Sequence, residues 1–165
     1  MTSNHDRARD WLAFSFENMA TALKLFETEQ YPACVFRIQL SVESLVFLCG
    51  MQFKKTHELS RLLDSFPSSS EQSLEPEVAG KIRQISTLAK QVEGVGTASR
   101  YGAEVNGRLV LPSELFDEKS AREFFAVTSK ITGLTAALLE GVEGFVEEAN
   151  RLKVLLKKLR RFSSA

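Results

Sequence analysis

The sequence is poor in the residues that build metal and redox sites. It holds only two histidines, His5 and His57, and two cysteines, Cys34 and Cys49. So few ligands, at these spacings, match no recognised zinc motif. The two cysteines fall on one predicted helix, about 22 Å apart at 1.5 Å per residue, which is too far for a disulfide. We therefore expect buried free thiols in a cytoplasmic protein, and no metal or other cofactor.

Long hydrophobic runs and an excess of charge of one sign are lacking too. No apolar run approaches the roughly 20 residues that a membrane span needs, and the polar N-terminus does not resemble a signal peptide. Lys+Arg and Asp+Glu both number 21, so no net charge favours nucleic acid or a membrane. The C-terminal segment differs, because it carries six basic residues and no acid from Arg151 onward: Arg151, Lys153, Lys157, Lys158, Arg160 and Arg161.

Motifs for catalysis are missing from the sequence as well. No Ser-His-Asp or Cys-His arrangement can be argued from the spacing. The glycine-rich stretch "GVGTASRYG", at 94–102, lacks the lysine of a P-loop and does not follow a predicted strand. We therefore assign no catalytic residue, and interpret 94–102 as a loop anchored by Tyr101 packing and an Arg100 salt bridge.

Helical periodicity is the dominant positive signal. Apolar residues recur three and four positions apart along most of the chain. The length suits one domain. These features predict an all-α fold, an antiparallel up-and-down bundle of four to five helices. The predicted helices cover about 6–28, 32–53, 57–66, 77–93 and the segment from 113 onward.

The second predicted helix is apolar on nearly all sides. Such a helix is buried, so we place it at the centre of the bundle or in a dimer seam. Arg37, Gln39 and Glu43 interrupt its apolar surface, and buried polar groups must find partners. We expect a buried polar network that includes Gln39 and Glu43 and joins Arg100 or a neighbouring helix.

Two further features concern the second half of the chain. Asn106-Gly107 between short alternating segments predicts a hairpin-like loop near 103–111. Apolar residues then repeat at spacing seven from Phe124 to Leu159, which predicts a seam along another helix. Glycines at 141–144 predict a break there, so the terminal segment is either a separate helix or the end of one long helix.

We divide the chain into a bundle at 1–147 and a basic amphipathic helical extension of the same domain at 148–165. The basic residues of the extension are candidates for RNA or partner contact, although an ordinary docked helix with a solvated basic face explains them as well. Aromatic residues for base stacking do not alternate with them. The candidates are Lys153, Lys157, Lys158, Arg160 and Arg161.

Four segments, taken in order, carry a family resemblance. They are "YPACVFRIQLSVESLVFLCGM", "HELSRLL", "SRYG" and "EKSAREFFAVTSKI". This order resembles the HEPN domain, a small helical bundle described as nucleotide-binding, over about 7–139. Gln39 and Glu43 match a Gln and Glu four apart in the family's second helix, and His57 matches its His-Leu pair. Arg100 and Tyr101 match an Arg-Tyr-Pro segment, with glycine in place of the proline.

The resemblance implies two kinds of activity. Many small prokaryotic members resemble partners of minimal nucleotidyltransferases in toxin–antitoxin-like pairs. Others resemble metal-independent ribonucleases, in which an Arg precedes a His by four to six intervening residues. Ahead of His57 those positions are Gly50, Met51 and Gln52, so the ribonuclease motif is absent and that activity is not carried over.

We therefore predict a non-catalytic binding module, a homodimer through the second and last helices, and the partner of a nucleotidyltransferase. Nucleotide and RNA are its candidate ligands, and the candidate nucleotide- or phosphate-binding residues are Arg37, His57, Arg100 and Tyr101. A structural role for His57 at a helix start remains the alternative for that residue. The alternative functions are a divergent ribonuclease, with Arg37 or Arg100 near His57, and a purely structural dimerisation module.

Overall fold

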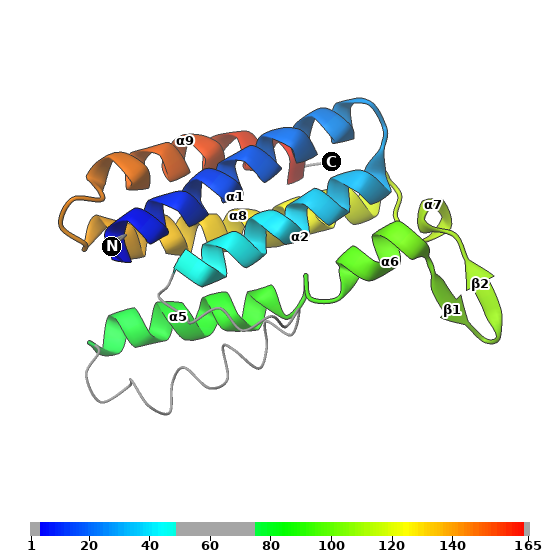
Figure 1. Cartoon of the computed structure of the whole chain (residues 1–165), viewed down its shortest axis with the longest axis horizontal. Helices are drawn as coiled ribbons and strands as arrows, with labels where there is room; N and C mark the ends of the chain where they lie inside the picture. The colour runs from blue at the N-terminus through cyan, green and yellow to red at the C-terminus, as the bar shows by residue number, and fades with distance from the viewer. Residues whose placement is uncertain (1–3, 49–74, 164–165) are drawn as a thin grey trace.

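The computed structural model describes residues 4–48 and 75–163 (Figure 1). The all-α prediction is confirmed, with one small two-stranded sheet. The predicted helix at 57–66, together with His57 and Cys49, lies outside the described residues. The described elements are α1 (Asn4–Glu27), α2 (Tyr31–Leu48), α5 (Pro76–Ala89), α6 (Val95–Tyr101), β1 (Ala103–Val105), β2 (Arg108–Val110), α7 (Pro112–Leu115), α8 (Glu118–Glu140) and α9 (Val146–Ser163).

The apolar helix α2 occupies the centre of the bundle. It contacts α1, α5, α6, α7 and α8. Val35, Ile38 and Val42 are fully buried within this single chain. Among the described helices, α2 is the one long and apolar enough to span a membrane, but 56% of it is buried inside the protein. That burial is expected of a core helix, so its apolar character is explained by packing.

The Cys34 thiol lies in this core. Its side chain is fully buried, and it is a free cysteine. Burial raises the pKa of the thiol to about 12. Because the thiolate is the reactive form, Cys34 acts as a small apolar residue rather than as a nucleophile.

The C-terminal segment is a separate helix folded back on the bundle. The chain reverses at 141–145, where Gly144 has φ 83°, and α9 then packs along α8. An aromatic cluster closes one end of this contact: the ring centroids of Phe26, Phe125 and Phe162 lie 5.4–5.6 Å apart. The apolar face of α9 therefore belongs to the same core as α1 and α8, and only its basic face is solvated.

An ion pair joins the start of α1 to the start of α9. Arg9 Nε donates to Glu148 Oε1 over 2.9 Å, and Arg9 Nη2 donates to the carbonyl of Gly144 over 3.1 Å. The side chain of Glu148 is 14% exposed. The hydrogen bond from Arg9 holds the pKa of the Glu148 carboxyl below its usual value. Glu148 also lies in the first turn of α9, where the positive end of the helix dipole favours an ionised carboxylate.

This lowered pKa predicts a pH-dependent contribution to stability. The contribution is present above the pKa that Glu148 has in the unfolded chain, and is lost as the pH falls through its folded pKa. We expect Glu148→Gln to lower the free energy of unfolding by about 1 kcal/mol at pH 7, a value reduced for solvent screening. The difference from the parent chain should shrink at pH 3, measured by urea denaturation at both pH values. The matched control is Glu147→Gln at the exposed neighbouring position. Glu147 shares the first turn of α9 but not the hydrogen bond from Arg9, so its loss should lower the stability much less than Glu148→Gln does. An equal loss in both variants would contradict the assignment.

The predicted hairpin is present. β1 and β2 pair antiparallel with Val105 opposite Arg108. Asn106 and Gly107 have φ 51° and 75°, which is the backbone of a type I′ turn. The hairpin projects from the end of the bundle beyond α6 (Figure 1).

Three boundaries differ from the sequence prediction. The helix predicted to end near residue 93 ends at Ala89, and the predicted loop at 94–102 contains the helix α6. The segment from 113 is split into α7 and α8, because Asp117 caps α8 by accepting a hydrogen bond from the Ser120 N–H over 2.8 Å. The extra helix matters for the site described next, because α6 packs against α2.

Candidate binding site

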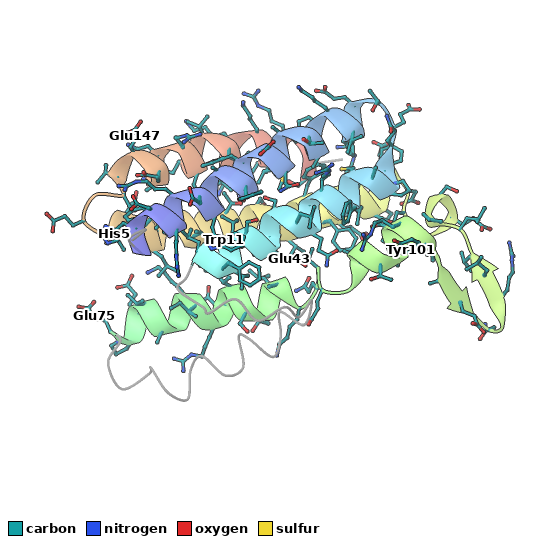
Figure 2. All side chains as sticks on the ribbon, in the orientation of Figure 1. His5, Trp11, Glu43, Glu75, Tyr101 and Glu147 are labelled. Atoms are coloured by element: carbon teal, nitrogen blue, oxygen red, sulfur yellow. The ribbon has the colours of Figure 1, made fainter. Side chains whose placement is uncertain are left out.

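Helix α6 packs closely against Gln39 of α2 at Gly96. A Cβ atom placed there would lie 1.7 Å from Gln39 Oε1. Gln39 is itself buried, and its Nε2 donates to Glu43 Oε1 over 3.1 Å. Figure 2 labels Glu43 on α2, on the side that faces α6. Any Cβ at position 96 would therefore require the Gln39 side chain to move.

Arg100 leaves the end of α6 and lies over two aromatic rings. Its Nε donates to the carbonyl of Gly96 over 3.1 Å. Its guanidinium carbon lies 4.7 Å from the ring centroid of Phe36 and 5.2 Å from that of Tyr101. These are cation–π distances. Tyr101 remains 69% exposed, so its ring offers a face to solvent at the edge of the contact (Figure 2).

Arg37, the next residue along α2, lies beside the same phenylalanine. Its guanidinium carbon is 5.9 Å from the Phe36 centroid, and its Nη1 donates to Asn18 Oδ1 on α1 over 3.1 Å. Two guanidinium groups therefore meet around one half-buried ring. We call Phe36, Arg37, Arg100 and Tyr101 the α2–α6 site.

The α2–α6 site has the chemistry of an anion-binding surface. Each guanidinium carries five N–H donors in a planar fork. Arg37 uses Nη1 and Arg100 uses Nε for these hydrogen bonds, and their other nitrogens make no hydrogen bond within residues 4–48 and 75–163. Forked donors of this kind match the oxygens of a phosphate group. Beside them, an exposed tyrosine ring can stack on a base.

The remaining predicted site residues do not join this group. His57 lies outside the described residues. On α9, Lys153 forms an ion pair with Glu140, and Arg160 lines a separate groove between α5, α8 and α9. Lys157, Lys158 and Arg161 are exposed. None of these basic residues of α9 is therefore among the residues that contact Phe36.

Sequence reasoning missed two participants in the site. Phe36 is part of an apolar stripe on α2 and gives no sign that two arginines will pack on it. Asn18 is a single buried amide on α1, and its Nδ2 donates to the carbonyl of Phe14 over 2.9 Å. Only the Arg37 contact distinguishes it, and that contact depends on how α1 packs on α2.

Comparison with known proteins decides the family. The family model of the HEPN domain matches residues 8–138. The chain belongs to the HEPN domain family. No curated protein and no solved structure matches it. The HEPN match runs from α1 to near the end of α8 and includes all four residues of the α2–α6 site, whereas α9 follows the matched region.

Membership of the HEPN family gives a context for Gly102. The Arg-Tyr-Pro segment typical of the family has glycine in the third position here. Gly102 has φ 78°, and a Cβ atom there would lie 2.2 Å from the carbonyl oxygen of Val110. Proline cannot adopt this φ. Glycine in place of the proline therefore allows the tight turn that leads from α6 into the hairpin.

Proposed function

We propose that this HEPN protein is a non-catalytic binding module whose α2–α6 site holds the phosphate groups of a nucleotide or of RNA. The observation that carries the proposal is the convergence of Arg37 and Arg100 on Phe36, beside the exposed Tyr101. The two guanidinium groups would bind the phosphates and the tyrosine would stack on the base. Like the small prokaryotic HEPN proteins that it resembles, it would act beside a minimal nucleotidyltransferase in a toxin–antitoxin-like pair in the cytoplasm.

The first test is calorimetric titration of the full chain with ATP. We expect saturable binding that Arg100→Ala weakens at least about tenfold, since a hydrogen bond to a charged group contributes on the order of 1.5–3 kcal/mol. Adenosine, which lacks the phosphates, should bind far more weakly than ATP. The matched control is Arg7→Ala, which removes an exposed arginine near the start of α1. This end of the bundle, marked by His5 in Figure 2, lies opposite the end that carries Tyr101.

Two results would contradict the proposal. Equal weakening by Arg7→Ala and Arg100→Ala would mean that only overall charge matters. Cleavage of RNA by the pure protein, abolished by His57→Ala in a chain that still folds, would favour the divergent ribonuclease instead. The described histidine offers no support for that alternative, because the His5 ring packs edge-on against Phe145, with centroids 5.3 Å apart.

A homodimer is the second candidate role, and one surface favours it. Ala33, Phe36 and Leu40 form a half-buried stripe along α2, and Phe14 on α1 is 55% exposed. The other apolar residues of α2 from Cys34 to Phe47 are buried within the chain, and the apolar face of α9 packs in the core. A dimer through α2 would therefore use this stripe. Light scattering of the same samples, with and without ATP, distinguishes a monomer from a dimer.

A further inference from the structure

A second surface, separate from the α2–α6 site, lies between α5, α8 and α9. It is an open groove of about 680 Å³. Its wall on α5 includes Arg83 and Leu88, its floor on α8 includes Lys130 and Leu134, and Arg160 reaches it from α9. The groove shares no residue with Phe36, Arg37, Arg100 or Tyr101.

The charge of this groove is one-sided. Arg83, Lys130 and Arg160 come from three different helices, and none of the described residues that line the groove is acidic. The whole chain has no net charge, so this concentration of positive charge is local. Lys130 is exposed, and no ion pair to it is found within residues 4–48 and 75–163. A surface of this kind attracts an anionic partner.

The centre of the groove is apolar. Leu88 and Leu134 are half-buried and pack against the core. Between the helices lies Gly133, where a Cβ atom would meet only Leu156 Cδ2 at 3.5 Å. Gly133 lines the groove without adding a side chain to it. A strip of leucine flanked by basic residues can bury the apolar face of a ligand while pairing with its acidic flanks.

We propose that this groove docks an acidic, amphipathic helical segment of a partner protein. The leucines would receive apolar residues spaced three and four apart, as in other helix-in-groove complexes. Lys130 would pair with a carboxylate on the flank of the segment, and the positive charges of Arg83 and Arg160 would favour an acidic segment beside it. RNA fits less well, because none of the described lining residues is aromatic and phosphate contacts have no use for an apolar floor.

The experiment measures fluorescence anisotropy of a labelled synthetic peptide with the full chain. The peptide has about 14 residues, with leucines on one helical face and glutamates elsewhere. A scrambled peptide of the same composition spreads the leucines around the helix. We expect the amphipathic peptide to bind at least about tenfold more tightly than the scrambled one, and Lys130→Glu to weaken it by at least about tenfold.

Lys158→Glu is the matched control, because it reverses an exposed lysine of α9 that does not line the groove. It should leave the affinity within about twofold of the parent value. Circular dichroism of both variants checks that they fold. Both variants should bind ATP as the parent chain does. A change in peptide binding can then be assigned to the groove and not to the α2–α6 site.

Three outcomes would overturn the proposal. Equal binding of the two peptides would mean that the groove recognises charge alone. Displacement of the peptide by a ten-nucleotide single-stranded RNA, with binding of that RNA lost in Lys130→Glu, would assign the groove to nucleic acid. No binding of the amphipathic peptide below about 100 μM would remove the docking role altogether.

Discussion

Replacing Leu159 by alanine is expected to lower the free energy of unfolding by about 2–5 kcal/mol. Leu159 is fully buried, although it lies near the end of the chain on α9. Its loss would leave a cavity in the core that α9 shares with α1 and α8. The change is measured by urea denaturation at pH 7. It is the largest effect expected here, because the substitution removes most of a fully buried leucine side chain.

Val154→Ala is the matched control on the same helix. Val154 is 57% exposed, and substitution there should change stability by less than about 0.5 kcal/mol. Equal and small effects in both variants would mean that α9 does not pack on the bundle in solution. The comparison matters because α9 follows the part of the chain matched by the HEPN model, so its place in the core is a property of this chain.

Gly102→Pro is expected to have the second largest effect, a loss of about 3 kcal/mol or more. Proline fixes φ near −65°, whereas Gly102 has φ 78°. It also removes the hydrogen bond that the Gly102 N–H donates to the Ala98 carbonyl over 2.9 Å. Any Cβ at this position meets the Val110 carbonyl. Proline is the family's usual residue here, so a substitution toward the family pattern should destabilise this protein.

The control for Gly102→Pro is Gly80→Ala inside α5. A Cβ at Gly80 meets nothing within 4 Å, and alanine is favoured over glycine in a helix by about 1 kcal/mol. We expect this variant to melt at the same or a higher temperature than the parent. Amide hydrogen exchange of 103–110 should show that Gly102→Pro loosens the hairpin first. A Gly102→Pro protein with the parent's melting temperature and hairpin protection would contradict the turn geometry.

The long helices could be predicted from sequence because their apolar spacing is regular. The hairpin was predictable because Asn-Gly supplies the two positive φ values that its turn requires. Helix α6 was not, because Gly94 and Gly96 are typical of a loop. Gly96 packs closely against the Gln39 side chain, a tertiary contact that no local pattern reports. The sequence left open whether α9 is a separate helix, because apolar residues at a spacing of seven are expected both in one long helix and in two helices that fold back on each other.

The candidate surfaces were harder to predict than the helices. Arg37 and Arg100 were recognised as basic residues of interest, but their meeting over Phe36 depends on how α6 packs against α2. Arg83 and Lys130 carry no signal in the sequence at all. They join Arg160 only because three helices bring them to one groove. Periodicity places residues on faces, and the packing of helices then decides which faces meet.

The central claim is that the α2–α6 site binds a phosphate-bearing ligand. The most direct test is a ¹H–¹⁵N correlation spectrum of the full chain titrated with ATP. We expect progressive shifts centred on the backbone amides of Phe36, Arg37, Arg100 and Tyr101, and smaller shifts in Arg100→Ala. An unchanged spectrum at millimolar ATP, or shifts confined to other parts of the chain, would contradict it.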